Sequence, residues 1–383
     1  MPGKLTIRDI ARLAGVSTTT VSRTLNHKPD VDPETRERIM RIINDHRYVP
    51  SGTASRLAGG RSRLVGVLAP SLTWPLMPNS LQGIAEVIEQ TAYELVLYSI
   101  SHRTDRSGLI DRILATELID GLIALYPDGI SRVESSNLAE REASNHLLEV
   151  YQQGFPVVIL DDQSLHTRIP WIGPDNRVGA YEATRHLIHM GHRRIAHIQG
   201  PAQYQCSYDR LAGYRQALEE AGIALDPTFV VQGDFTTPGG QAAADGLLDA
   251  DERPTAIFAA NDQMAYGAML AADSRRLHVP DDLAVIGFDD IAVFALMRPA
   301  LTSVRQPFQE MGKRAAETLL ALAHAPNTFD GGWYDQITQP GAARSNGDAL
   351  RTAHIQLPTE LVVRESSGAH VTRAHAEPAR VGE

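Results

Sequence analysis

Apolar residues recur at the spacing of an α-helix near the N-terminus of the chain. Thr6 and Asp9 form a capping box for a first predicted helix, and Gly15 ends it where a positive φ is favourable. Ser17 caps a second predicted helix over residues 18–25. The apolar stripes of these helices are Ile7, Ile10, Ala11 and Ala14, followed by Val21 and Leu25. Two helices joined by a short turn that contains glycine are typical of a helix-turn-helix, whose second helix enters the major groove of DNA.

A third helix is predicted after Asp32, because this N-cap residue is followed by Pro33 at the first helical position. Its apolar stripe is Ile39, Ile42 and Ile43. From residue 64 onward, short apolar runs alternate with helical stretches such as 210–221 and 262–276. The runs form two series of predicted strands, at 64–68, 95–98, 121–125 and 157–160, and at 195–198, 230–231, 256–260 and 283–288. This alternation predicts two α/β lobes with parallel sheets and ligand sites at the carboxyl ends of the strands.

The distribution of charge separates the N-terminal part from the rest of the chain. The net charge of the 383 residues is −10, but residues 1–63 carry +6 and the remainder carries −16. A basic N-terminal block on an acidic body favours nucleic acid as the partner of that block. The chain shows no apolar run of transmembrane length and no secretory signal at its start, and its single cysteine, Cys206, allows no intrachain disulfide. We therefore expect a cytoplasmic protein in which Cys206 is a buried or half-buried packing residue.

The candidate base-reading residues lie at the start of the second predicted helix. Thr18 and Thr19 open it, and Arg23 follows one turn later. A threonine hydroxyl and methyl can contact base edges, and arginine can pair bidentately with guanine. Taken alone, the same residues are equally compatible with a capped helix start and a solvated arginine.

A longer motif makes the DNA-binding interpretation specific. The run TIRDIARLAGVS over residues 6–17, continued by TVSR at 20–23 and LN at 25–26, resembles the headpiece of the lac/galactose repressor family. VDPETR at 31–36 and YVP at 48–50 extend the resemblance. It implies an operator-binding homodimer. The predicted DNA contacts are Thr6, Ser17, Thr18, Thr19, Ser22, Arg23, Asn26 and Leu57.

The segment after the headpiece has two interpretations. Its small residues at 51–58 and its basic, glycine-containing stretch at 59–63 are compatible with a simple tether. The family resemblance instead implies a hinge helix in which Leu57 is a wedge in the minor groove. Ser51 and Ser55 stand where the family usually has Asn and Arg, which puts the contacts that flank the wedge in doubt.

The body of the chain also carries family-like stretches. They are HL–MGHRRIA at 186–196, R–GY–AL at 210–218, ANDQMA–G at 260–267, VIGFDD at 285–290 and LPTELVVRES at 357–366. They resemble the type I periplasmic-binding-protein-like sensor domain of the same repressors. The expected fold is therefore an N-terminal all-α helix-turn-helix headpiece followed by a two-lobed α/β sensor domain.

The expected domain boundaries follow from these patterns. The headpiece is expected at 1–49, the hinge or linker at 50–63, and the effector-binding and dimerisation domain at 64–383. The first lobe is expected at about 64–172 and 304–326, and the second at about 173–303 and 350–366. Residues 327–353 are predicted to be an inserted surface loop, in which Trp333 and Tyr334 are less strong candidates for a lid or a dimer contact.

Residues at predicted strand ends are candidates for holding a small-molecule effector. Five positions match ligand contacts of the family, and they are Asp161, Arg210, Phe235, Asn261 and Asp289. Trp74 is a candidate for a second ring, contributed by the first lobe. A sugar needs groups that pair with its hydroxyls and a ring that covers its apolar face, and this set offers both. The loop at Trp74 lacks the Asn-Pro and the two aromatics usual in the family. The identity of the effector therefore cannot be inferred from that of a relative. The structural alternatives are a loop cap for Asp289 and a salt bridge for Arg210.

Other chemistry finds little support in the chain. His186, His189 and His192 have no ligand partner at metal spacing and are interpreted as packing and helix-end residues; no cofactor or metal is expected. No nucleotide-binding loop or hydrolase motif anchors an enzyme. The leading hypothesis is a repressor controlled by a sugar. The alternatives are a nucleobase or protein co-regulator as effector and, more remotely, a sugar-binding transport protein, which would need a signal peptide.

Overall fold

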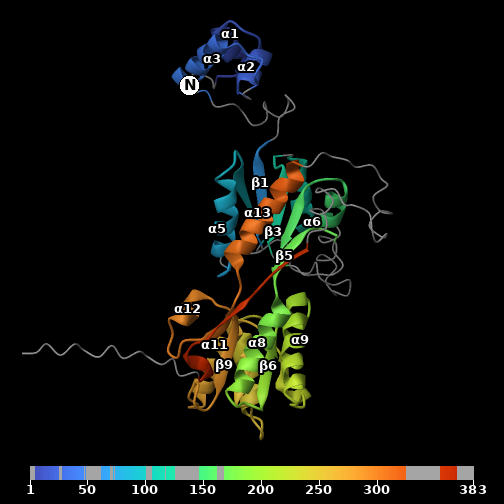
Figure 1. The fold of residues 1–383 in the computed structure, drawn as a ribbon, viewed down its shortest axis with the longest axis vertical. Coiled ribbons are helices and arrows are strands. Elements are labelled where there is room, and N and C mark those ends of the chain that lie inside the picture. The colour runs from blue at the N-terminus through green and yellow to red at the C-terminus, as the bar shows by residue number, and fades with distance from the viewer. Residues whose placement is uncertain are drawn as a thin grey trace, which may run out of the picture.

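The computed structural model describes the headpiece and most of the two lobes. The described residues are 5–25, 28–46, 48, 62–69, 72, 74–100, 106–116, 118–125, 146–161, 168–324 and 354–368. The predicted hinge up to residue 61, including Leu57, lies outside them, as do Asn26 and the predicted insertion at 327–353. In the described part, no helix combines the length and the apolar character that crossing a membrane requires. Figure 1 shows a small helical unit, followed in the chain by two α/β units.

The headpiece is built from three helices whose ends match the predicted caps. They are α1 (Ile7–Ala14), α2 (Thr18–Leu25) and α3 (Pro33–Asp45). The capping box of Thr6 and Asp9 is present, and Gly15 adopts φ 65°. Ser17 Oγ accepts a hydrogen bond from the Thr20 amide at 3.1 Å. The core of the unit is formed by Ile10, Val21 and Ile39, each fully buried. The predicted helix-turn-helix is confirmed.

The first lobe is a six-stranded parallel sheet in the order β11-β5-β4-β3-β1-β2. Its strands are β1 (Leu64–Ala69), β2 (Glu94–Ser99), β3 (Gly121–Leu125), β4 (Val157–Leu160), β5 (Trp171–Pro174) and β11 (His354–Leu357). One face packs against α5 (Met77–Ile88) and α13 (Phe308–His324). The other packs against α6 (Arg106–Ala115) and a helix at 146–152. β1, β3 and β4 are buried on both faces, as central parallel strands require.

The second lobe repeats this plan with the order β12-β10-β9-β8-β6-β7. Its strands are β6 (Ile195–Gln199), β7 (Val230–Gln232), β8 (Ala256–Ala259), β9 (Ala284–Asp289), β10 (Thr302–Arg305) and β12 (Glu360–Val362), which is antiparallel to β10. The helices are α8 (Asn176–His189), α9 (Gln205–Glu220), α10 (Thr237–Leu248), α11 (Asp262–Ser274) and α12 (Ala292–Ala295), with 3-10 turns at Pro227–Phe229 and Glu365–Ser367. α8 and α9 cover one face, and α10 and α11 the other.

Within the described residues, the chain crosses between the sheets three times. The crossings follow β5, β10 and β11, at residues 174–176, 305–308 and 357–360. The expectation that all of 350–366 belongs to the second lobe is wrong, because β11 pairs in parallel with β5 of the first sheet and only β12 joins the second. The eight predicted strands are confirmed. The four that were not predicted, β5, β10, β11 and β12, have only three or four residues each.

Candidate functional site

The exposed face of α2 carries the predicted base-reading residues. Ser17, Thr18, Thr19 and Arg23 are exposed, whereas Val21 on the opposite face is fully buried in the headpiece core. The buried face of α2 packs on the other headpiece helices, and its exposed face is available to enter the major groove of DNA. The contacts predicted for Ser17 and Thr6 compete with structural roles, because the Ser17 hydroxyl caps α2 and the Thr6 hydroxyl donates to Asp9 Oδ2 at 2.7 Å.

Arg23 has an intramolecular partner in the absence of DNA. Its Nη2 lies 2.8 Å from Asp30 Oδ2, and the side chains are 54% and 47% exposed. An ion pair this exposed contributes little net stability, because both charges remain hydrated. The guanidinium can therefore exchange Asp30 for a base edge or a phosphate at small cost.

Arg210 is the centre of the candidate effector site in the second lobe. It projects from α9 and is only 3% exposed. Its Nε donates to Asn176 Oδ1 at 2.8 Å, its Nη1 donates to the Ala260 carbonyl, and its guanidinium lies 3.8 Å from the centre of the Phe288 ring. These contacts hold the guanidinium in one orientation at the carboxyl ends of the strands.

Asp289 ends β9 in an unusual backbone conformation, with φ 113°. Its Oδ1 accepts a hydrogen bond from Gln306 Nε2 at 2.6 Å and lies 3.8 Å from Arg210 Nη1. Burial raises the pKa of the Asp289 carboxyl to about 6, although Arg210 and Gln306 both favour its charged form. The predicted salt bridge of Arg210 is thus present, but it is long and does not repay the whole cost of burying the carboxylate.

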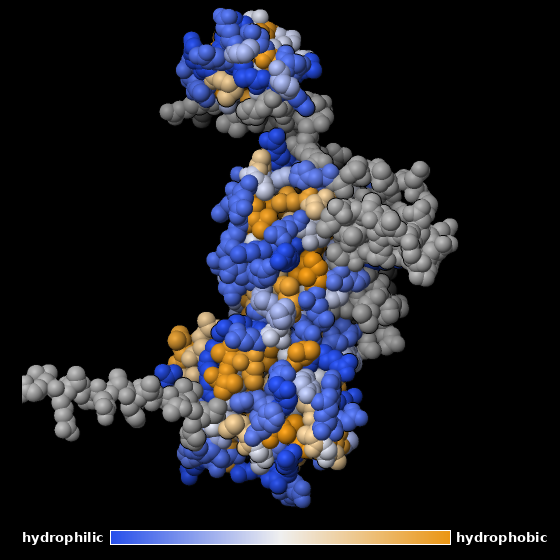
Figure 2. All heavy atoms as spheres, viewed as in Figure 1, coloured by the Kyte–Doolittle hydropathy of each residue, from blue (hydrophilic) through white to orange (hydrophobic). Residues whose placement is uncertain are grey.

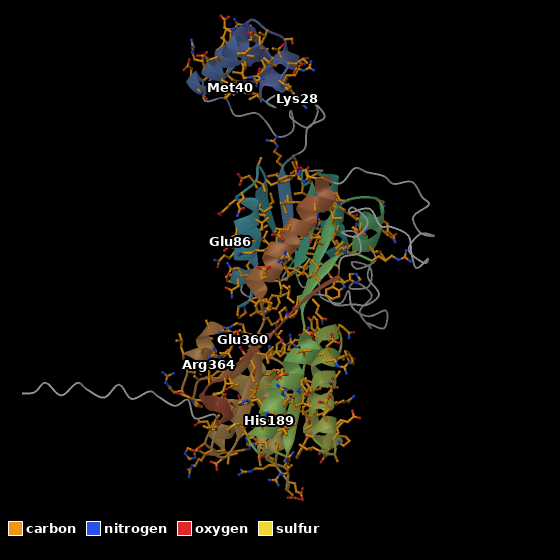
Figure 3. The ribbon with its side chains drawn as sticks, viewed as in Figure 1. Lys28, Met40, Glu86, His189, Glu360 and Arg364 are labelled. Carbon is orange, nitrogen blue, oxygen red and sulfur yellow. The ribbon has the colours of Figure 1, made fainter. Side chains whose placement is uncertain are left out.

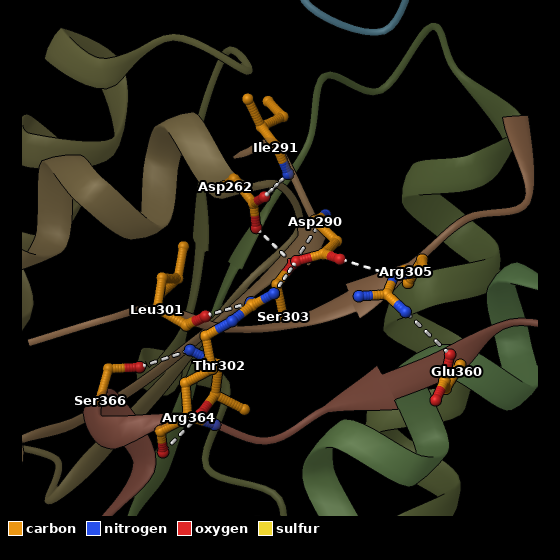
Figure 4. Close-up of polar contacts among 10 residues, drawn as sticks. All are labelled: Asp262, Asp290, Ile291, Leu301, Thr302, Ser303, Arg305, Glu360, Arg364 and Ser366. Atoms are coloured by element: carbon orange, nitrogen blue, oxygen red, sulfur yellow. Dashed lines mark hydrogen bonds and ion pairs between the residues drawn. The ribbon is translucent and has the colours of Figure 1, made fainter. Parts of the chain in front are cut away.

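The next residue, Asp290, is held in a different network, shown in Figure 4. One oxygen accepts from Arg364 Nη2 at 2.6 Å and the other from Arg305 Nε at 2.7 Å. Arg305 also contacts Glu360 at 3.2 Å. This network joins the end of β9 to β12 and to the second crossing segment; Figure 3 shows Glu360 and Arg364 on that part of the chain. Asp290 is therefore structural, whereas Asp289 faces Arg210 and Gln306.

Asn261 and Phe235 form one unit beside this centre. Asn261 caps α11, because its Oδ1 accepts from the Met264 amide at 2.9 Å, and its Nδ2 donates to the Phe235 carbonyl at 3.0 Å. Phe235 has φ 65°, and its ring centre lies 5.6 Å from that of Tyr204. The Phe235 ring lies against Gly200, where a Cβ atom would come within 2.2 Å of it. The two rings supply an apolar surface. A ligand contact for Asn261 can use its second amide hydrogen or the second lone pair of its Oδ1.

Charged residues from both lobes influence the pKa of Cys206. The pKa of this thiol is raised to about 12, mainly by burial; Arg210 acts in the opposite direction, and Asp161, Asp289 and Asp209 add to the increase. Asp161 follows β4 of the first lobe and has φ 70°. Trp74 instead packs on the apolar cluster of the first lobe, against which Ile291 of the second lobe also packs. Asp161, Arg210 and Asp289 thus all act on the Cys206 thiol, whereas Trp74 packs on the first-lobe cluster.

Three buried polar residues of this region were not predicted. Asn176 Nδ2, Ser207 Oγ and Gln306 Oε1 have no hydrogen-bond partner among the described residues, and each residue is at most 4% exposed. Buried polar atoms are nearly always satisfied by protein, water or ligand, so these three are candidates for a bound molecule. The sequence does not single these residues out, because the Asp-Asn pair at the start of α8 predicts only a helix cap and Gln306 follows a strand, TSVR, with one apolar residue.

The histidines that raised the question of a metal have other partners. His186 Nε2 lies 3.0 Å from Ser367 Oγ, and His192 Nδ1 lies 3.0 Å from Thr255 Oγ1. Burial lowers the pKa of both. Within the part of the chain that the structure describes, no cluster of three or more His, Cys, Asp or Glu side chains has the arrangement of a metal site.

Comparison with known proteins agrees with this architecture. The family "Bacterial regulatory proteins, lacI family" matches residues 6–51, and "Periplasmic binding protein-like domain" matches 184–367. The HTH-type transcriptional regulator DegA of Bacillus subtilis (strain 168) is 33% identical over 366 residues, 95% of this chain and 98% of DegA. The lac repressor dimer bound to operator and the anti-inducer ONPF has a TM-score of 0.73 at 28% identity, covering 95% of this chain and 99% of that one. The transcriptional regulator CelR in complex with cellobiose has a TM-score of 0.63 at 29% identity, covering 94% and 99%.

A helix-turn-helix headpiece joined to a two-lobed periplasmic-binding-protein-like domain defines a DNA-binding regulator of transcription. The chain belongs to the lacI family of bacterial regulatory proteins. Its relatives are transcriptional regulators rather than enzymes, and several are named repressors.

Proposed function

We propose that this protein is a repressor that binds a palindromic operator as a homodimer and responds to a sugar held between its lobes. The observation that carries the proposal is the buried constellation of Arg210, Asp289 and Gln306. The ring of Phe235, whose carbonyl accepts a hydrogen bond from Asn261, offers an apolar surface. A carboxylate and an amide oxygen accept hydrogen bonds from hydroxyls, a guanidinium donates to them, and a ring covers the apolar face of a sugar. The cellobiose complex of CelR, a protein of similar fold, is a precedent for such a ligand.

An apolar segment after β9 supports association of two chains. On and next to α12, Val293 is 58% exposed and Leu296 80% exposed. Figure 2 shows apolar residues gathered at the position of α12, at the left edge of the second lobe. Exposed apolar side chains grouped in this way are typical of interfaces. The lac repressor, of similar fold, is described as a dimer on its operator, and we propose the same assembly for this chain.

The proposed DNA interface consists of the exposed face of α2, the linker with its wedge residue Leu57, and the remaining predicted contacts. A dimer that places two such helices in major grooves requires half-sites about one helical turn apart. Selection of bound duplexes from a random pool should return a near-palindrome with a pyrimidine–purine step, CG by preference, at its centre. A preferred target with one asymmetric half-site would contradict the dimer proposal.

The effector is tested by a thermal-shift screen of the purified protein. Free mono- and disaccharides, nucleobases and nucleosides are compared at equal concentration, since a ligand that binds only the folded state raises its stability. The hit is then added to the operator-binding assay. A sugar that stabilises the protein and changes operator affinity supports the proposal. A nucleobase as the only hit would replace the sugar. If neither class binds and only a protein partner alters operator affinity, the proposal of a sugar effector is wrong.

A further inference from the structure

A single carboxylate holds the point at which the sensor domain begins. Asp120 Oδ1 accepts from the Ser62 amide at 3.0 Å and from the Ser62 hydroxyl at 2.7 Å, and Asp120 Oδ2 accepts from the Arg63 amide at 2.9 Å. Both carboxylate oxygens are therefore used on two consecutive residues. Hydrogen bonds to an ionised acceptor are roughly twice as strong as neutral ones.

The backbone at this point is fixed from a second side. The Arg63 carbonyl accepts from the Glu94 amide at 2.9 Å, and the Leu64 carbonyl accepts from the Asp120 amide at 2.8 Å. Glu94 begins β2 and Asp120 immediately precedes β3, the two neighbours of β1. Arg63 adopts φ 55°, a left-handed conformation that a non-glycine residue keeps only when its surroundings enforce it. The chain thus enters the first-lobe sheet through a turn that three strands hold.

The last described residue of the headpiece is also held in place, by contacts within the headpiece itself. This residue, Tyr48, is 9% exposed, packs in the headpiece core and donates its amide to the Ile43 carbonyl at 2.9 Å. The connection between the two units is therefore bounded by Tyr48 on one side and by Ser62 on the other.

We propose that Asp120 is a positioning residue for DNA binding, because its carboxylate fixes where and in which direction the linker leaves the first lobe. Two headpieces on one duplex must reach half-sites of fixed separation and orientation. A turn anchored to β1, β2 and β3 carries any movement of the first-lobe sheet to the start of the linker. Without Asp120, the direction in which the chain leaves Ser62 and Arg63 is no longer set by the first lobe.

Charge and geometry make opposite predictions for the loss of Asp120. Removal of a negative charge near DNA favours binding through the reduced repulsion of phosphates. Loss of the hydrogen bonds from Ser62 and Arg63 to Asp120 disfavours DNA binding. Added linker length alone is a small effect, because extending the connection from residues 49–61 to 49–63 lowers the effective concentration only about 1.2-fold. A larger loss therefore reports orientation.

The test compares Asp120→Ala with Glu94→Ala in the full-length protein. Glu94 has an exposed side chain and the same charge, and only its backbone amide takes part in the anchor. Affinity is measured for a duplex selected by the wild-type protein and for a random duplex of equal length. Ser62→Ala, which removes one of the three bonds, and Asp120→Asn, which replaces one acceptor oxygen by a donor, provide a graded series.

We expect Asp120→Ala to weaken binding of the selected duplex about tenfold, which corresponds to about 1.4 kcal/mol, and to leave random-duplex binding unchanged or tighter. Glu94→Ala should leave both unchanged or tighter. Amide hydrogen exchange at Ser62 and Arg63 should become faster in Asp120→Ala only. If Asp120→Ala opens these amides yet binds the selected duplex within 1.5-fold of wild type, or more tightly, the proposal is wrong. Should Asp120→Ala not fold, a graded loss from Ser62→Ala to Asp120→Asn supports the proposal, and wild-type affinity in both overturns it.

Discussion

Replacing Asp289 by asparagine is expected to change the stability of the protein and its affinity for the effector in opposite directions. The buried carboxyl has its pKa raised to about 6 from an ordinary value of 3.8. One pKa unit corresponds to 1.36 kcal/mol, so keeping this group ionised at pH 7 costs the folded protein about 3 kcal/mol. Because the pKa is higher in the folded state, the folded protein binds more protons between pH 4 and pH 6, and its stability falls as the pH rises through that window.

Asp289→Asn should therefore stabilise the ligand-free protein at pH 7, by an amount approaching about 3 kcal/mol. The new side chain keeps the Oδ1 that accepts from Gln306, and Arg210 keeps its bonds to Asn176 and the Ala260 carbonyl. At pH 4 the wild-type carboxyl is protonated in the folded state, so the gain should nearly vanish. The same variant should lose affinity for a hydroxylated effector, since a hydrogen bond to a charged group contributes about 1.5–3 kcal/mol.

The assay is urea unfolding of the full-length protein at pH 4, 5.5 and 7, monitored by near-ultraviolet circular dichroism. The effector is titrated in parallel. Asp251→Asn, at an exposed position of the same lobe, is the control for removing one charge. A pH-independent gain, or a variant that is less stable than wild type at pH 7, would refute the reasoning about burial. A variant that binds the identified effector with wild-type affinity would show that Asp289 is not part of the site.

Two further substitutions test neighbouring claims. Asp290→Ala should destabilise the protein by about 2–4 kcal/mol, the opposite sign to its neighbour, because Arg364 and Arg305 lose their shared partner; unfolding at pH 7 measures this, and a neutral result would show that the network contributes nothing. Arg23→Ala should weaken binding of the selected operator by about 1–3 kcal/mol while random-sequence binding changes little, and an equal loss on both duplexes would reduce Arg23 to a phosphate contact.

The headpiece was predictable from the sequence because its signals are local. Thr6 with Asp9, Gly15, Ser17 and Asp32 each act within one helical turn, so the sequence alone places these four caps, and the structure has them there. The eight strands named from the sequence were predictable for a similar reason, since each coincides with a short run that is mostly apolar. The strand ends in turn indicated where a ligand would lie.

The strands next to the crossings between the two lobes, and the sheet that each one joins, were decided only by tertiary structure. β10, β11 and β12 have the sequences TSVR, HIQL and ELV, with at most two apolar residues each, so no long apolar run marks them. Which sheet receives β11 depends on pairing with β5, about 180 residues earlier in the chain. The alternation of exposed and half-buried residues in β11 is typical of a strand but does not say which sheet the strand joins.

The roles of individual site residues were likewise settled by their surroundings. The sequence marks Asp289 and Asp290 as one acidic pair, yet the fold directs the first to Arg210 and Gln306 and the second to Arg305 and Arg364. Nor does it mark Asn176 or Gln306, whose buried polar atoms acquire meaning only beside Arg210 and Asp289. Residue type sets which bonds a side chain can make, but burial and neighbours brought together from distant segments decide which of them it makes.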